Sequence, residues 1–277
     1  MKLTNVGKNC WIRIPEEALY HDEHFLDNIP RFDVVVHFLG KDLMEREHLK
    51  SGALKNTVMV GVDFGGFSGP YEKAFSEHPQ LFEEILKAVQ KRVSRHFQRQ
   101  AAIENLAVTA WSGGYGAEAA ILRDLPESTY RDKLKAVVMI DGIHTGYTRN
   151  GSGSLIGLNP AAMEPFLRFA QTASADGKFM GIVHSSIVAV SNHAYCSSTD
   201  SANWLTWKTG GKPQNVPVLE SDPYGLERYQ EYHSQESKIP QGFHVWGFKG
   251  QKEADHVASM GAMQFIFRDH LAPMGFH

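Results

Sequence analysis

Six short runs rich in apolar residues recur along the chain, and glycine or polar residues follow each of them. The runs are continuous and do not alternate with polar positions, which is typical of strands buried on both faces of a parallel sheet. They occupy residues 32–38, 57–62, 106–110, 136–140, 179–183 and 243–248, and a weaker run at 10–14 predicts an additional strand.

Helical patterns separate these runs. Apolar residues recur at three- and four-residue spacing in two long segments, 79–97 and 256–270, and shorter helices are predicted at 115–122, 161–172 and 198–207. Strands that alternate with helices predict an α/β fold. We expect a doubly wound, mostly parallel sheet of about eight strands with helices on both faces.

Two segments interrupt this alternation. Residues 145–160 are rich in glycine, serine and asparagine, and residues 210–241 are polar with several prolines. Each lies between core elements, so we interpret both as excursions over the edge of the sheet that cover the active site. The sequence shows no repeat, low-complexity tract or linker, which predicts a single domain over residues 1–277.

The composition narrows the class of protein. Hydrophobic residues make up 42% and charged residues 21%, as in ordinary soluble domains. The net charge of −3, without a basic stripe, argues against a nucleic-acid partner. No apolar run approaches the roughly 20 residues of a membrane span. The first residues lack the apolar core of a signal peptide, so we expect a cytoplasmic protein, although a removed leader would leave no trace.

Candidate chemistry gathers directly after the predicted strands. In an open parallel sheet, ligands bind beyond the carboxyl ends of the strands. The side chains at these positions are unusually polar: His37, Asp63, Ser112, Asp141, His144, His184 and, after the last strand, His256. We predict that His37, His144 and His184, together with Trp111, contact the substrate.

Ser112 lies in the stretch Ala110-Trp111-Ser112-Gly113-Gly114, between a predicted strand and a predicted helix. A strand-to-helix turn this tight requires small residues two positions before and two positions after the serine. The serine then takes a strained conformation, and its hydroxyl stands exposed at the start of the helix. The pattern therefore predicts a nucleophile. A glycine-rich turn with a serine cap is the structural alternative.

The other parts of a serine-hydrolase site have candidates as well. The backbone N–H groups of Gly113 and of Phe38 or Leu39 are predicted to form an oxyanion hole, since the loop after residue 38 comes two strands before the nucleophile. His256, between the last strand and the last helix, is the predicted general base. Its carboxylate partner is predicted to be Asp141, with Asp200 as the alternative.

The stretches AWSGGYGAEAAIL, HFLG and ADHVASM resemble the nucleophile turn, oxyanion loop and histidine of the α/β-hydrolase superfamily. Alanine replaces the first glycine of the turn, and the chain order Ser, Asp, His agrees with that superfamily. The resemblance extends over residues 32–270 and does not assign a subfamily. It implies a serine esterase that forms an acyl-enzyme on a small-molecule ester. An amidase or peptidase, or a non-catalytic binding protein of this fold, is the alternative.

No metal or organic cofactor is expected for this chemistry. The stretch His21-Asp22-Glu23-His24 is interpreted as a solvated loop, because no further metal ligands accompany it. The glycine-rich residues 65–70 lack the lysine of a phosphate-binding loop and are interpreted as a mobile loop at the rim of the site. Nothing in the sequence supports a particular oligomeric state.

Overall fold

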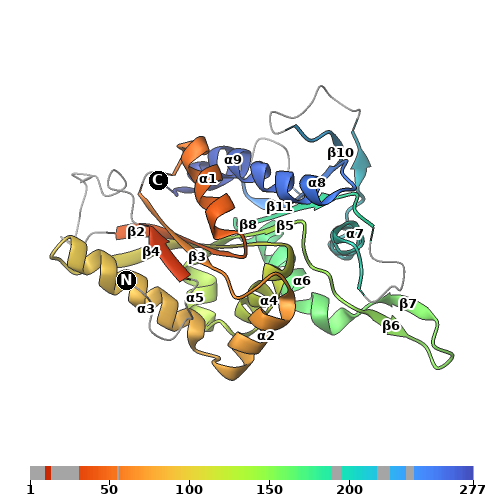
Figure 1. Cartoon of the computed structure of the whole chain (residues 1–277), viewed down its shortest axis with the longest axis horizontal. Helices are drawn as coiled ribbons and strands as arrows, with labels where there is room; N and C mark the ends of the chain where they lie inside the picture. Colours follow the sequence, from red (N-terminus) through yellow and green to blue (C-terminus); the bar gives the residue numbers. More distant parts are fainter. Residues whose placement is uncertain are drawn as a thin grey trace.

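A nine-stranded sheet forms the centre of the computed structural model, which describes residues 10–13, 31–54, 56–188, 195–216, 225–234 and 240–276. The strands follow the spatial order β1-β3-β2-β4-β5-β8-β11-β10-β9 (Figure 1). Their bounds are β1 Cys10–Arg13, β2 Arg31–Phe38, β3 Thr57–Val62, β4 Ala102–Trp111, β5 Leu134–Ile140, β8 Phe179–Ser185, β9 Gln214–Asn215, β10 Arg228–His233 and β11 Gly242–Phe248.

The six central strands, from β3 to β11, are parallel, whereas β1, β10 and β9 pair antiparallel at the two edges. All six strongly predicted strands are therefore present, and the weak one is the edge strand β1. The predicted fold class, a doubly wound and mostly parallel α/β sheet, is confirmed. Nine strands replace the expected eight or so because β9 and β10 arise from the polar segment 210–241.

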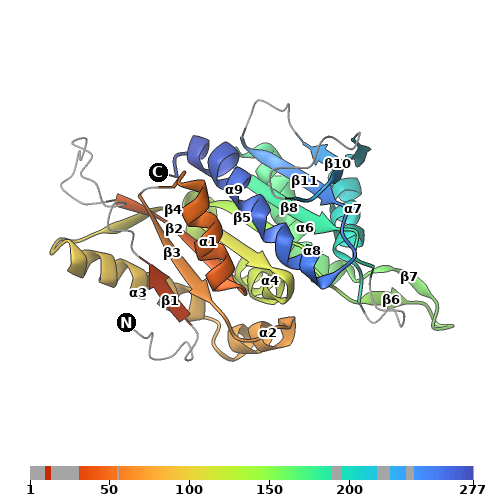
Figure 2. The ribbon, with the colours of Figure 1, turned by 45° about the horizontal axis from the view of Figure 1, so that its top comes forward.

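Helices cover both faces of the sheet (Figures 1 and 2). Val34 and Val36 of β2 pack into a larger core beneath helices α2 to α7, whereas Val35 points into a second core beneath α1, α8 and α9. The larger layer contains α2 Ser68–Glu77, α3 Leu81–His96, α4 Tyr115–Asp124, α5 Glu127–Asp132, α6 Pro160–Ala175 and α7 Ser198–Lys208. The smaller layer contains α1 Lys41–Ser51, α8 Glu253–Ala258 and α9 Met263–Ile266. Burial on both faces explains why the strands have continuous apolar runs.

Three helices, α1, α2 and α5, form where the sequence pattern predicted none. The most consequential is α2, which starts at Ser68 inside the predicted rim loop. Its first residues, Ser68-Gly69-Pro70, read as a turn in isolation. Proline is nevertheless compatible with the first turn of a helix, where its missing N–H has no intrahelical acceptor.

The two predicted excursions contain strands. Residues 145–160 hold the hairpin of β6 Tyr147–Arg149 and β7 Leu155–Leu158, which projects from the body of the molecule (Figure 1).

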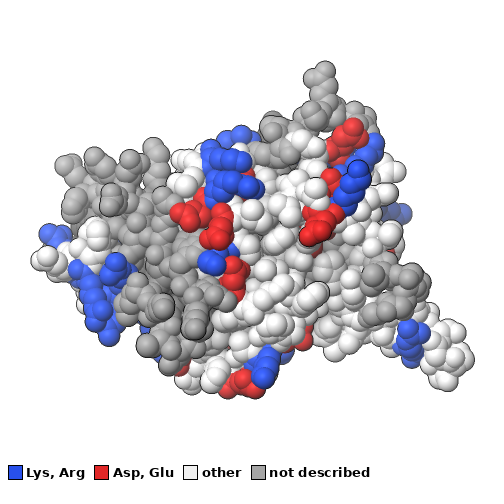
Figure 3. Space-filling model, in the orientation of Figure 1, with Lys and Arg blue, Asp and Glu red and all other residues white. Residues whose placement is uncertain are grey.

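On the face drawn in Figure 3, charges of both signs gather over α1 and around α8 and β10, separated by largely uncharged surface. Within the described parts of the chain, no helix is long and apolar enough to cross a membrane.

The strand order creates one position suited to a ligand. From β2 the chain continues outward to β3, and from β4 it continues in the opposite direction to β5, although β2 and β4 are neighbours. The crevice beyond the carboxyl ends of two such strands is where open α/β sheets bind their ligands. Ser112 follows β4 directly and thus lies at this switch point.

Candidate active site

Ser112 occupies a sharp turn between β4 and α4. Its φ of 49° falls in the left-handed region, which non-glycine residues seldom adopt. A 3₁₀ turn over Ser112–Gly114 leads directly into α4. Ala110, two residues before the serine, is fully buried. The strained serine between a strand and a helix has the geometry that the sequence pattern requires of a nucleophile.

The two glycines after Ser112 allow other backbone segments to approach the turn. A Cβ atom on Gly113 would lie 2.8 Å from Cα of Phe67, and a Cβ atom on Gly114 would clash with the carbonyl oxygen of Phe38. The turn is therefore held between the loop that precedes α2 and the end of β2. Side chains at these two positions would push the loops apart.

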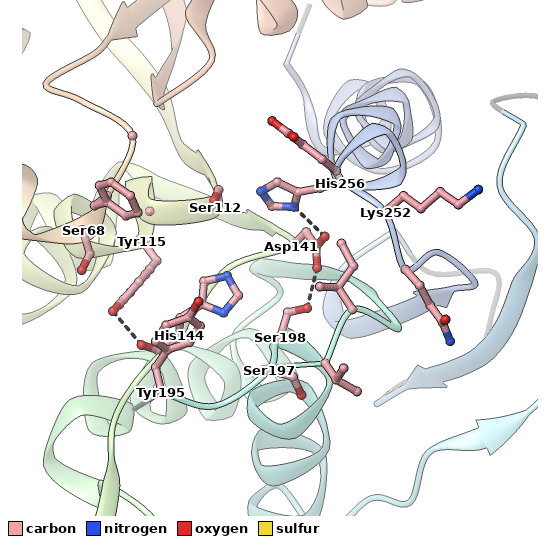
Figure 4. A pocket seen from close by; sticks show the side chains of 17 residues that line it. Ser68, Ser112, Tyr115, Asp141, His144, Tyr195, Ser197, Ser198, Lys252 and His256 are labelled. Atoms are coloured by element: carbon pink, nitrogen blue, oxygen red, sulfur yellow. Dashed lines mark hydrogen bonds and ion pairs between the residues drawn. The ribbon is translucent and has the colours of Figure 1, made fainter. Parts of the chain in front are cut away.

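His256 and Asp141 form a hydrogen-bonded pair beside Ser112. The distance from His256 Nδ1 to Asp141 Oδ2 is 2.7 Å, and the imidazole lies between Asp141 and Ser112 (Figure 4). Asp141 comes one residue after β5 and, like the serine, has a left-handed backbone, with φ 45°. Ser112 and Asp141, two residues with strained backbones at the ends of neighbouring strands, therefore lie beside a histidine of α8.

The carboxylate of Asp141 is buried and accepts several hydrogen bonds. Its Oδ1 atom accepts bonds from the backbone N–H and the hydroxyl of Ser185, each at 2.9 Å, and from the hydroxyl of Ser198. Burial raises the pKa of Asp141, but the hydrogen bond and charge of His256, with the bonds from the two serines, outweigh it and lower the pKa to about 2. Asp141 is therefore ionised at neutral pH.

Asp200 does not approach His256. Its carboxylate accepts bonds from the backbone N–H and the hydroxyl of Ser197 and completes a capping box at the start of α7. It also accepts a 3.2 Å bond from the Tyr147 hydroxyl. Of the two carboxylates weighed as the histidine's partner, the structure brings Asp141 to the histidine and places Asp200 at a helix cap.

The prediction that Phe38 or Leu39 supplies an oxyanion donor is wrong. The N–H of Leu39 donates to the carbonyl of Val62 at 3.0 Å, and the loop after β2 does not line the cavity beside Ser112. Instead, the cavity is lined next to Gly113 by Phe67 and by Ser68, the first residue of α2. The loop after β3 occupies the place that the sequence assigned to the loop after β2.

The predicted substrate contacts of His37 and His184 are wrong as well. Both side chains are fully buried, and neither lines the cavity. His37 Nδ1 lies 2.8 Å from the hydroxyl of Thr109, and His184 Nδ1 lies 2.9 Å from that of Thr199. Burial lowers the pKa of His37 to about 3. For His184 the reason is strand length, because β8 continues to Ser185, two residues past the predicted run 179–183. His37 lies inside the run 32–38 that the pattern itself assigned to a strand, so its polar side chain belongs to the buried strand β2.

Of the remaining predicted contacts, His144 lines the cavity and Trp111 does not. His144 Nδ1 lies 3.2 Å from the carbonyl oxygen of Cys196, which can only accept, so Nδ1 carries the proton. Burial lowers the pKa of His144. The indole of Trp111 stacks on the imidazole of His256, with ring centroids 4.6 Å apart and an interplanar angle of 29°.

The cavity beside Ser112 has a volume of about 450 Å³. Its lining includes three exposed apolar or aromatic side chains, Phe67, Val188 and Tyr195, which are 81%, 83% and 39% exposed. Lys252 and Glu253 line it as well. No described residue of 145–160 or 210–241 lines it, so the expected cover over the site is not contributed by the described parts of these segments.

Phe67 and Ser68 belong to the segment 65–70 that was expected at the rim of the site, whereas Ser185 and Ser198 were not predicted to support it. Only the position of Ser185, two residues after the apolar run 179–183, could have drawn attention to it. The stretch 21–24 lies outside the described residues. Among the residues that the structure describes, no group of three or more histidine, cysteine, aspartate or glutamate side chains is arranged to hold a metal ion.

Comparisons with protein-family models and with curated proteins find no match to this sequence. Among solved structures, the chain is similar to an S-formylglutathione hydrolase from Agrobacterium tumefaciens, with 12% identity, 95% of this chain and 89% of that chain covered, and a TM-score of 0.48. It is also similar to a poly(3-hydroxybutyrate) depolymerase from Bordetella parapertussis, with 11% identity, 87% and 79% coverage, and a TM-score of 0.44. At these values the two likenesses assign no activity to this chain.

Proposed function

We propose that this protein is a serine hydrolase of the α/β-hydrolase type that cleaves carboxylic esters. The proposal rests on the position of the His256 imidazole, which lies between Ser112 and Asp141 in the lining of a cavity (Figure 4). Its Nδ1 atom is 2.7 Å from Oδ2 of Asp141. Nucleophile and carboxylate come from the ends of β4 and β5, and the base comes from α8, in the roles that a Ser-His-Asp triad requires.

In the proposed reaction, the hydroxyl oxygen of Ser112 attacks the ester carbonyl carbon while His256 Nε2 accepts the hydroxyl proton. The tetrahedral intermediate collapses when the bond to the alcohol breaks, and His256 returns its proton to the leaving oxygen. Water then attacks the acyl-serine, again with His256 as base, which releases the acid and regenerates Ser112. Asp141 keeps the proton on Nδ1, so that Nε2 faces the serine as an acceptor.

The oxyanion is proposed to be held by the N–H of Gly113 and an N–H of the segment Phe67–Ser68. Helix geometry supports this pair, because the first N–H groups of the 3₁₀ turn and of α2 have no intrahelical acceptor. Both segments line the cavity, and they are in close contact with each other. Two such donors typically lower the barrier by a few kcal/mol.

An ester is the preferred substrate in this proposal, because an alkoxide leaves more readily than an amide nitrogen. The exposed Phe67, Val188 and Tyr195 at the rim suit an apolar acyl or alcohol group. A pair of substrates that share one acyl group, one an ester and the other an amide, tests this preference through kcat/KM. Faster cleavage of the amide would show that the peptidase or amidase alternative holds.

A fluorophosphonate probe tests the catalytic role directly. We expect the probe to modify Ser112, which mass spectrometry of the digested protein would locate, and we expect Ser112→Ala to abolish both labelling and ester hydrolysis. Ser152, exposed in the turn of the β6–β7 hairpin, provides a matched serine-to-alanine control that keeps both. If Ser112 stays unlabelled and Ser112→Ala retains hydrolysis, the proposal fails. A folded protein that neither reacts nor hydrolyses would fit a binding protein.

A further inference from the structure

Trp111 is the residue next to the nucleophile in the sequence and a direct neighbour of the base in space. Its indole stacks on the imidazole of His256, and its Nε1–H donates a 3.1 Å hydrogen bond to the main-chain carbonyl of His256. The same carbonyl also accepts a bond of 2.6 Å from the hydroxyl of Ser259. The histidine is thus held through its ring and through its backbone.

The loop after β2 fixes the indole from another direction. Gly40 has a left-handed φ of 78°, and a Cβ atom there would lie 3.0 Å from Cε3 of Trp111. The N–H of Gly40 donates to Asp63 at 2.9 Å, which anchors the loop to the end of β3. The indole also packs with the second core, beneath α1 and α9. The glycine of the HFLG stretch therefore makes room for Trp111.

We propose that Trp111 is a positioning residue that clamps His256 in line with Ser112 and stabilises its protonated form through the face of the indole. The inference rests on the proposed function, since it assigns His256 the role of base. A cation over the face of a tryptophan gains more than over phenylalanine, and a leucine in its place offers no such face. The clamp thereby combines two effects, the orientation of the imidazole and the electrostatic preference for the imidazolium.

The effect of Trp111 has to be separated from that of neighbouring charges. The charged or titratable side chains that line the cavity with His256 are Asp141, His144, Lys252, Glu253, Tyr115 and Tyr195. Asp255, on the same helix, caps the backbone N–H groups of Gln251 and Lys252. None of these groups bonds to the indole, so substitution of Trp111 removes the aromatic face and leaves the charges in place.

Two substitutions divide the clamp into its parts. Trp111→Phe keeps an aromatic face over the imidazole and loses the bond to the carbonyl, whereas Trp111→Leu loses both. Trp207, which is 62% exposed on α7, supplies the matched control Trp207→Leu. We expect kcat/KM to fall about tenfold or more in Trp111→Leu and less in Trp111→Phe, because a misplaced general base forfeits part of its contribution.

The decisive readout is the titration of the His256 ring, followed by NMR in the Ser112→Ala background. The resonance is assigned by its absence in His256→Gln. We expect the midpoint to lie about half a pH unit lower in Trp111→Leu, with a smaller change in Trp111→Phe and none in Trp207→Leu. Thermal unfolding verifies that each variant is folded.

The outcomes distinguish the inference from the proposed function. An unchanged midpoint in folded Trp111→Leu overturns the clamp, even if Ser112 reacts with the probe as expected. Conversely, an unlabelled Ser112 removes the proposed function, whereas the NMR titration still reports whether the indole stabilises the imidazolium. Loss of activity in Trp111→Leu with an unchanged midpoint would mean that Trp111 has only a packing role, which also contradicts the inference.

Discussion

Asp141 and Glu118 are both buried carboxyl groups, but they differ in their hydrogen-bond partners. Asp141 is 2% exposed, accepts bonds from Ser185 and Ser198, and pairs with His256. Glu118 of α4 is fully buried, and neither of its carboxyl oxygens has a hydrogen-bond partner among the described residues. The pKa of Asp141 is lowered to about 2, whereas burial raises the pKa of Glu118 well above its usual value.

The comparison shows that burial alone does not set the charge of a carboxyl group. Desolvation raises the pKa of both residues, and only the donors around Asp141 reverse this effect. A buried carboxylate that keeps its charge beside a histidine can orient a general base. A buried carboxyl group without partners instead keeps its proton and lowers stability.

The largest expected effect concerns activity. Asp141→Asn should reduce kcat by about 10⁴-fold, because an amide can hold the imidazole in the wrong tautomer and cannot balance its charge. Glu118→Gln is the matched control and should retain kcat, since Glu118 does not line the cavity. Steady-state ester hydrolysis measures both variants. Comparable losses in the two variants would remove the functional distinction between these carboxylates.

Acid should reveal the stabilisation that Asp141 contributes. Its pKa in the folded protein is below the ordinary aspartate value of 3.8, so the contribution is present above about pH 3.8 and is lost as the pH falls to about 2. The shift corresponds to about 2 kcal/mol of unfolding free energy. Urea unfolding as a function of pH should show this loss in the wild type and not in Asp141→Asn. Parallel pH profiles would contradict the assignment.

Glu118 should show the opposite pH dependence. Its pKa is raised in the folded protein, so its stability contribution is complete below the ordinary glutamate pKa of 4.5 and is lost as the pH rises through the folded pKa. Glu118→Met should therefore stabilise the protein by about 1–3 kcal/mol at neutral pH, through removal of an unpaired polar group. Denaturant unfolding measures the gain, which should shrink in acid. A variant less stable than the wild type at neutral pH would mean that Glu118 has a partner.

A smaller effect is expected from one of the donors around Asp141. Ser198→Ala removes a hydrogen bond to a charged group, worth about 1.5–3 kcal/mol, and should lower kcat/KM about tenfold through a less well-held carboxylate. Ser201, on the same helix but bonded to the carbonyl of Ile143, provides the serine-to-alanine comparison and should change kcat/KM less. Equal effects of the two substitutions would show that only the packing of α7 matters.

The smallest expected effect concerns the rejected carboxylate. Asp200→Ala should cost about 1 kcal/mol of unfolding free energy through loss of the capping box of α7. Ester hydrolysis should stay at the wild-type rate, because Asp200 bonds to Ser197 and Tyr147 and not to His256. A large loss of kcat without a loss of stability would return Asp200 to consideration as the triad acid.

The pattern of apolar runs predicted most of the fold. Continuous apolar runs predicted all six parallel strands, because burial on both faces leaves no polar positions in them. The helices that the pattern missed, α1, α2 and α5, begin with charged or turn-forming residues. In α1, Glu47 and His48 are buried, so polar side chains occupy core-facing positions that a hydrophobic pattern does not register. The cytoplasmic location and the single domain stay predictions.

The sequence predicted some parts of the site and not others. Local rules sufficed for the turn at Ser112, since a strand, small residues and a helix follow one another directly in the chain. The choice between Asp141 and Asp200 depended on which carboxylate faces a residue more than fifty positions away. The burial of His184 depended on two further residues of strand, which apolar patterning does not resolve.

By itself, then, the sequence determined the parallel sheet, the strained serine and the strand-end positions of Asp141 and His256, because each depends on neighbours in the chain. Only the tertiary structure decided that Asp141 pairs with His256, that Phe67 and not Leu39 lines the cavity at Gly113, and that Trp111 packs against the base. These relations join residues from separate strand ends. Their distances follow from strand register and from the point at which α2 begins, neither of which is encoded locally.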